Sequence, residues 1–83
     1  MKSKRKTIDV SYPLPLNEEY DDAVCDVAKD HYGQELGSGA GFGFRDHDFS
    51  FSAKRADQAY KAFKALPIKG IEVSEPYEEE DDD

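Results

Sequence analysis

A histidine between two aspartates is the arrangement in this sequence most suggestive of catalysis or metal binding. His47 lies between Asp46 and Asp48, and an imidazole beside carboxylates serves both general acid–base catalysis and metal ligation. Polar and apolar residues alternate here, which predicts a β-strand, and successive side chains of a strand point to opposite faces. The three groups therefore cannot converge. We expect a half-buried His47 beside Phe49, with both aspartates in solvent.

The other candidate catalytic or metal-binding residues are isolated. His31 has no cysteine partner at a spacing that binds zinc. Cys25, the single cysteine, lies among acidic residues, which disfavour the reactive thiolate. A single cysteine excludes an internal disulfide and suits a reducing compartment. We expect no enzyme activity, no cofactor and no metal.

Glycine occupies every second position in a short stretch, at Gly37, Gly39, Gly41 and Gly43. The spacing matches neither G-x-x-x-x-G-K-[ST] nor G-x-G-x-x-G, and the stretch follows a predicted helix instead of a strand, so a nucleotide-binding loop is not expected. As a strand, the stretch would present bare backbone on one face, which a neighbouring chain or a partner could approach closely.

The elements that must position these residues follow from periodicity and from helix-ending residues. Residues 7–14 alternate as a half-buried strand, and Asn17 is placed to cap a helix over residues 18–32. We predict further strands over residues 34–43, 47–51 and 68–74, a turn near residues 43–46, and a second helix between Ser52 and Pro67. On this register, the apolar residues of the hairpin pack beneath the helices: Leu36, Ala40, Phe42, Phe44, Phe49 and Phe51.

This β-α-β-β-α-β order resembles the ferredoxin-like plait, an α+β fold with a four-stranded antiparallel sheet and two helices on one face. The resemblance covers residues 7–74, which we take as one domain. Residues 1–6 are rich in lysine and arginine and predict a basic flexible arm. Residues 75–83 are rich in carboxylates and predict an acidic disordered tail.

The tetrapeptide Gly41-Phe42-Gly43-Phe44 is similar to the third-strand motif of RNA recognition motif domains, whose elements follow the same order. The resemblance implies single-stranded RNA binding on the open sheet face. Asp9, however, stands where that family has a stacking aromatic residue. Asp46, Asp48 and Glu72 would share its face, and clustered carboxylates repel phosphates. RNA binding is therefore the alternative hypothesis.

Charge is the strongest functional signal in the chain, whose formal net charge is −8. The first helix is acidic and the second is basic, so the two could support each other electrostatically. Alternatively, the acidic helix could face a partner. The residues predicted to bind a partner are the acids of the first helix and of the hairpin: Glu18, Glu19, Asp21, Asp22, Asp26, Asp30, Asp46 and Asp48.

Carboxylates spaced along a surface can imitate a nucleic-acid backbone and occupy a basic groove. We therefore expect a small, non-enzymatic protein-binding module, in the manner of a phage or virus inhibitor or regulator that occupies a nucleic-acid-binding site on its partner. We expect a cytoplasmic location, in the host cell if the source is viral. No apolar run is long enough to span a membrane. Dimerisation through the edge or the face of the sheet stays open.

Overall fold

The computed structural model describes residues 5–78, which form two helices and an antiparallel sheet. In chain order the elements are β1 (Arg5–Pro13), α1 (Glu18–Asp30), β2 (Gln34–Gly41), β3 (Phe44–Ser52), α2 (Ala53–Lys64), β4 (Glu72–Val73) and β5 (Tyr77–Glu78). The α+β class predicted from the sequence is confirmed. Residues 1–4 and 79–83, which hold most of the predicted basic arm and acidic tail, lie outside the described residues.

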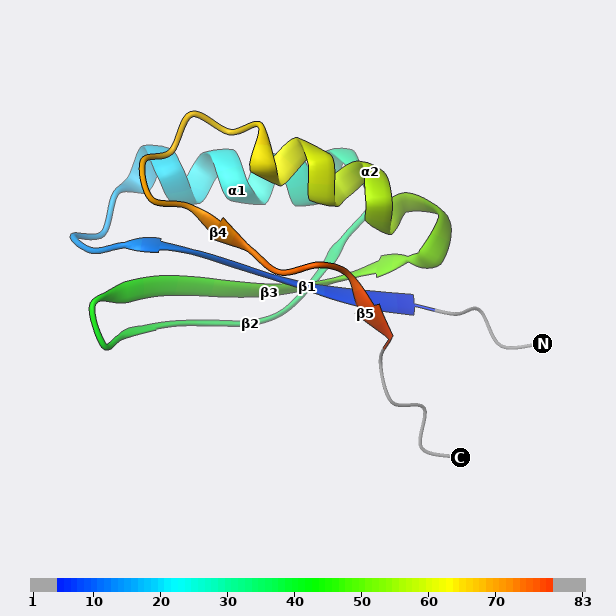
Figure 1. Cartoon of the computed structure of the whole chain (residues 1–83), viewed down its shortest axis with the longest axis horizontal. Helices are drawn as coiled ribbons and strands as arrows, with labels where there is room; N and C mark the ends of the chain where they lie inside the picture. The colour runs from blue at the N-terminus through cyan, green and yellow to red at the C-terminus, as the bar shows by residue number, and fades with distance from the viewer. Residues whose placement is uncertain (1–4, 79–83) are drawn as a thin grey trace.

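The sheet has the strand order β2-β3-β1-β4, and β5 also pairs with β1. Every pairing is antiparallel. Both helices lie on the same face of the sheet, and the opposite face carries no described helix (Figure 1). The ordered sheet extends beyond the predicted 7–74 at both ends, because β1 begins at Arg5 and β5 contains Tyr77 and Glu78.

The core lies between the sheet and the two helices. Alternate residues of β1 and β3 enter it, and Ile8 lies directly across from Phe49. Phe63 of α2 stacks on Phe49 and meets the edge of Phe51, with ring centroids 5.7 and 6.0 Å apart. Each fully buried side chain of this size stabilises the fold by about 1.5–3 kcal/mol through the hydrophobic effect. The predicted burial of Phe49 and Phe51 is confirmed.

The predicted packing of β2 beneath the helices is wrong. The pairing with β3 shifts between Glu35 and Gly37, so Leu36 is the extra residue of a β-bulge and is exposed. A bulge reverses which residues face which side of the sheet. Ala40 lies across from Arg45 on the helix side. It is nevertheless exposed, and β2 is the edge strand of the sheet.

The hairpin turn lies earlier than residues 43–46. Gly41 pairs with Phe44, and the two residues between them, Phe42 and Gly43, both have positive φ, at 53° and 84°. Two such residues make the tight turn whose twist matches that of the flanking strands. Phe42 and Phe44 are therefore exposed and not in the core. Arg45 lies within β3 and not at the tip.

The predicted last strand, residues 68–74, is reduced to the two residues of β4. Gly70 has a φ of +78°, and a Cβ there would lie 2.7 Å from Cγ of Pro13. Only glycine tolerates both the left-handed backbone and so close an approach. The chain turns at this point and joins the sheet at Glu72 and Val73, where Val73 lies opposite Val10.

The helix ends follow the predicted capping only in part. The Asn17 side chain accepts hydrogen bonds from the backbone N–H groups of Glu19 and Tyr20, as predicted. Helix α1 ends at Asp30, two residues before the predicted end, and Tyr32 takes the left-handed conformation that glycine commonly supplies after a helix, with φ of 57°. Gly33 is required for space, because a Cβ there would overlap the Phe51 ring.

Within residues 5–78, neither helix has both the length and the apolar character needed to cross a membrane.

Candidate functional site

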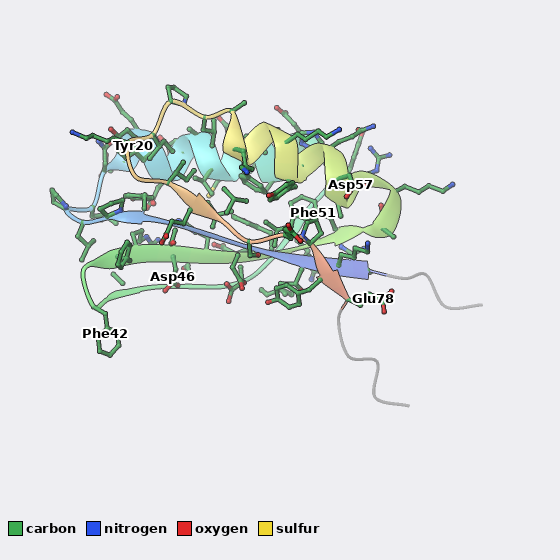
Figure 2. All side chains as sticks on the ribbon, viewed as in Figure 1. Tyr20, Phe42, Asp46, Phe51, Asp57 and Glu78 are labelled. Carbon is green, nitrogen blue, oxygen red and sulfur yellow. The ribbon has the colours of Figure 1, made fainter. Side chains whose placement is uncertain are left out.

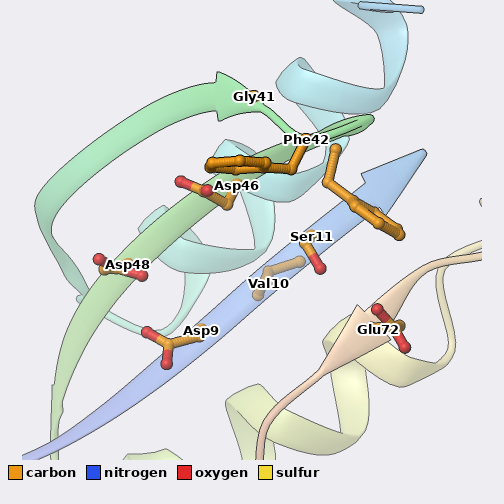
Figure 3. A pocket seen from close by; sticks show the side chains of 9 residues that line it. Asp9, Val10, Ser11, Gly41, Phe42, Asp46, Asp48 and Glu72 are labelled. Carbon is orange, nitrogen blue, oxygen red and sulfur yellow. The ribbon is translucent and has the colours of Figure 1, made fainter. Parts of the chain in front are cut away.

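The open face of the sheet carries a cluster of carboxylates. Directly opposed residues of antiparallel strands share a face, and β1 and β3 place Asp9 opposite Asp48 and Ser11 opposite Asp46. Glu72 of β4 lies opposite the same Ser11, because β4 pairs with the edge of β1 that does not pair with β3. Four acidic side chains thus surround a shallow depression of about 420 Å³. Figure 3 shows Asp46 and Asp48 on β3, Asp9 on β1 and Glu72 on β4 around it.

Two of these carboxylates oppose each other across the strands. The hydrogen bond between Asp48 and Asp9, together with partial burial and the negative charges of Asp9 and Asp46, raises the pKa of Asp48 to about 6. Tyr77 of β5 donates its hydroxyl to the Asp9 carboxylate, with O–O distances of 3.1 and 3.2 Å. The ion pairs within residues 5–78 involve none of the four carboxylates of the open face.

Glycine leaves the adjoining part of this face bare. Gly37 lies opposite Asp48, and Gly39 lies opposite Asp46, so both belong to the open face. A Cβ at Gly37 or Gly41 would meet nothing within 4 Å, and one at Gly39 would make an ordinary 3.5 Å contact with Asp46. The described fold therefore does not need these glycines for space. Since glycine in a strand costs about 0.5–1 kcal/mol relative to alanine, their presence calls for another explanation.

Aromatic side chains border the face at the hairpin end. Phe42 is fully exposed, and it projects from the tip on the side away from the helices, the same side as Asp46 (Figure 2). Phe44 is also exposed and lines the depression. A bulky residue with positive φ is strained by about 1–2 kcal/mol, so the exposed ring of Phe42 is held in an unfavourable turn without burying any of its own surface.

Seven of the eight acids predicted to bind a partner are divided between two faces. Asp46 and Asp48 lie on the open sheet face. The exposed acids of α1 lie in the helical layer, on the other side of the sheet: Glu18, Glu19, Asp22, Asp26 and Asp30. Among the described residues, no ion pair joins α1 to α2. Arg55 of α2 instead stacks on the ring of Tyr32, 4.3 Å from its centroid.

Asp21 belongs to an internal polar cluster that the sequence reasoning missed. Its carboxylate accepts hydrogen bonds from the Tyr12 hydroxyl at 2.6 Å and from Arg45 Nε at 3.3 Å. Its Oδ1 also lies 3.0 Å from His47 Nε2. The other ring nitrogen of His47, Nδ1, lies 3.2 Å from Oε2 of Glu35. We name Tyr12, Asp21, Glu35, Arg45 and His47 the buried polar cluster, in which Tyr12 and His47 are buried and the Glu35 side chain reaches the surface.

The predicted half-exposure of His47 is wrong, since the side chain is only 2% exposed. It does stack on Phe49, as the alternation implied, and its two sequence neighbours do point to the other face. Its carboxylate partners come from α1 and β2, which are 26 and 12 residues away in the sequence. A strand pattern shows which face a residue occupies but not which distant side chains meet it there.

The cluster shifts the pKa values of Asp21 and Tyr12. Burial opposes the charge on Asp21, but the hydrogen bonds from Tyr12 and His47 and the charge of Arg45 hold the pKa of Asp21 below its ordinary value. Burial and the bond to Asp21 raise the pKa of Tyr12. Every buried side-chain nitrogen and oxygen atom of the described residues has a hydrogen-bond partner. The buried polar atoms of the cluster therefore bond within the protein, as they do in polar networks that stabilise a fold.

Burial and the charges of Glu35 and Asp21 raise the pKa of the Cys25 thiol, which keeps it in the unreactive thiol form. Across residues 5–78, no three histidine, cysteine or acidic side chains are arranged to hold a metal ion. The open face is suited to binding a positively charged group, because its carboxylates are accessible and repel one another.

Comparison of the sequence with protein-family models and with curated proteins finds no match. The tetrapeptide resembling the RNA recognition motif straddles the β2–β3 turn, with Gly41 ending β2 and Phe44 beginning β3.

Proposed function

We propose that this protein is a small, non-enzymatic ferredoxin-like module whose open sheet face binds a basic segment of another protein. The sheet order and the two helices on one face support assignment to the ferredoxin-like plait. The observation that carries the functional part is the open face itself. Four carboxylates gather there and form no ion pair within residues 5–78.

Three features of the face favour a protein segment as the ligand. The exposed rings of Phe42 and Phe44 offer apolar contact beside the charges, as interface anchors do. The glycines of β2 leave space for a chain to lie flat on the backbone. The repulsion between Asp9 and Asp48 is relieved when a cation arrives, so binding a lysine or arginine side chain gains free energy that the isolated protein lacks.

The proposed binding surface is the open face of the sheet and not helix α1, which holds most of the acids predicted to bind a partner. The exposed acids of α1 then serve to keep the protein soluble and to steer a basic partner toward it. Occupation of a basic nucleic-acid-binding site, as by a phage or virus inhibitor, is the form of the function that this charge pattern favours.

Neutralising one acidic surface at a time tests the proposal. The double variant Asp46→Asn/Asp48→Asn removes charge from the open face, and Asp22→Asn/Asp26→Asn removes the same charge from α1. The probe is a short synthetic peptide with lysine at alternate positions, titrated calorimetrically at low salt. We expect the sheet variant to weaken binding about tenfold or more and the helix variant to change it little.

The reverse ranking would place the binding surface on α1 and contradict the proposal. Equal, small effects of both variants would show that the peptide is attracted only by the overall negative charge. A single-stranded RNA that binds at low salt, with affinity falling as salt rises, would favour the RNA-binding alternative.

A further inference from the structure

The ring of His47 is buried between two carboxylates from different elements. Nε2 faces Oδ1 of Asp21 at 3.0 Å, and Nδ1 faces Oε2 of Glu35 at 3.2 Å. An ionised carboxylate only accepts hydrogen bonds, and a neutral imidazole has one N–H donor and one acceptor nitrogen. A neutral ring, itself only 2% exposed, would therefore place a lone pair against a carboxylate oxygen. Only the doubly protonated ring satisfies both contacts.

We infer that His47 is held as an imidazolium and works as a proton-dependent clamp that fastens α1 and the edge strand β2 to the centre of the sheet. Without the second proton, one of the two links becomes repulsive. The clamp adds a side-chain link at the edge of the sheet, because β2 is paired on one side only, to β3. Glu35 lies directly before the bulge, where that pairing is irregular.

The charged and titratable groups around the ring come from every neighbouring element. Asp21 and the Cys25 thiol lie on α1, Glu35 lies on β2, Tyr12 lies on β1, and Arg45 lies beside His47 on β3. With a charged His47, the cations His47 and Arg45 balance the two carboxylates of the buried polar cluster. A neutral ring would leave the buried cluster with excess negative charge, which burial penalises.

The clamp is independent of the proposed binding function but would act beside it. Loss of the proton would loosen the start of β2, the strand whose glycines border the acidic face. Rising pH would then increase the mobility of that edge, while the core strands β1 and β3 stay in place.

Nitrogen chemical shifts of the His47 ring test the inference in the wild-type protein. We expect both ring nitrogens to carry protons at pH 7. A neutral tautomer at that pH, with the second contact bridged by a protonated carboxyl group, would overturn the inference.

A variant sharpens this test without removing the histidine. In Glu35→Gln the amide can donate to Nδ1, so a neutral ring becomes acceptable and the doubly protonated fraction at pH 7 falls. The control Glu18→Gln changes the same charge at an exposed residue that makes no contact with the ring. Equal fractions in both variants would contradict a role for Glu35 in holding the proton.

Amide hydrogen exchange tests the predicted change in the mobility of β2. After correction for the intrinsic pH dependence of exchange, β2 amides of the wild type should exchange about tenfold faster once the ring is titrated, because one charge-assisted bond is lost. The amides of β1 should not respond. Uniform acceleration across the sheet would indicate global destabilisation and would contradict a clamp specific to β2.

Discussion

Some individual side chains of this protein occupy positions that lower the stability of the fold. Asp48 lies opposite Asp9, and their interaction raises the pKa of Asp48 to about 6. Phe42 exposes its whole ring from a strained turn. Locally unfavourable residues of this kind concentrate at functional sites, where the binding of a ligand can relieve the conflict. They are therefore the residues whose substitution best separates stability from binding.

Replacing Asp48 with asparagine should stabilise the protein near pH 7.5 by about 1–2 kcal/mol, a figure reduced for solvent screening. The asparagine amide can donate to Asp9 as a protonated Asp48 does. Because the folded protein binds this proton more tightly than the unfolded chain, the contribution of Asp48 to stability decreases between pH 3.8 and about 6 and stays low above that. Denaturant unfolding across this range should show that decrease in the wild type relative to Asp48→Asn.

The matched control is Asp57→Asn, which removes an exposed carboxylate from α2, away from the open face. It should leave both the stability and its pH dependence nearly unchanged. A control that stabilised the protein as much as Asp48→Asn would mean that net charge, and not the opposed pair, sets the effect.

Replacing Phe42 with asparagine should raise the free energy of unfolding by about 1 kcal/mol, since asparagine followed by glycine suits this turn and no buried surface is lost. The same variant should weaken binding of the lysine peptide. Phe42→Ala separates the two effects, because it removes the ring and keeps the strain, so it should weaken binding without stabilising. Thermal unfolding and calorimetry measure both quantities, and unchanged binding in both variants would remove Phe42 from the proposed interface.

At the scale of elements, the sequence pattern gave a wrong prediction for the packing of β2. Strands β1 and β3 alternate regularly, and their buried residues were predictable because the period of two is unbroken. In β2 the glycines carry no side chain to reveal a face, and the bulge at Leu36 reverses the alternation. The two helices were predictable from their apolar spacing and from the Asn17 cap, to within two residues at the start and end of α1.

The glycines of the chain should respond differently to alanine. Gly37→Ala should raise stability by about 0.5–1 kcal/mol, because a Cβ there meets nothing and the unfolded chain becomes less flexible. Gly33→Ala should destabilise by about 1–3 kcal/mol, because its Cβ would overlap the Phe51 ring. Denaturant unfolding of the pair checks both signs. If Gly37→Ala were as destabilising as Gly33→Ala, β2 would not have the open backbone described here.

Helix α1 should depend on Asp21 for its attachment to the sheet. Asp21→Asn should lower stability at pH 7 by about 2 kcal/mol, because Arg45 and His47 lose a charged acceptor. The pKa of Asp21 is held below 3.8, so the stability that it contributes is present above that pH and is lost as pH falls further. Acid titration of the wild type and the variant by circular dichroism should therefore converge at low pH. A constant difference at all pH values would contradict the ionic contribution.

The buried polar cluster could not have been read from the sequence. Its members come from β1, α1, β2 and β3, so only the tertiary arrangement brings them together. The acids of α1 form a uniform series in the sequence, and nothing in that series separates Asp21, which turns inward, from Asp22, which is exposed. The carboxylates of the open face were individually predictable from strand alternation. Their grouping around one depression depends on the pairing of β1 with both β3 and β4.

At the scale of the whole molecule, the sheet separates two acidic surfaces. The exposed acids of α1 are spread along a helix that is already packed on the sheet, whereas the carboxylates of the open face lie beside bare backbone and exposed aromatic rings. The overall charge of −8 draws basic partners to either surface. Which surface would hold the proposed basic segment is therefore a question of local structure and not of net charge.

Backbone amide NMR during titration with the lysine peptide tests the central proposal most directly. We predict that the largest chemical shift changes fall on the open face and its border, at Asp9, Gly37, Gly39, Asp46 and Asp48, and that they saturate. Changes concentrated along the exposed side of α1 would contradict the account, and so would small unsaturated changes spread over both faces.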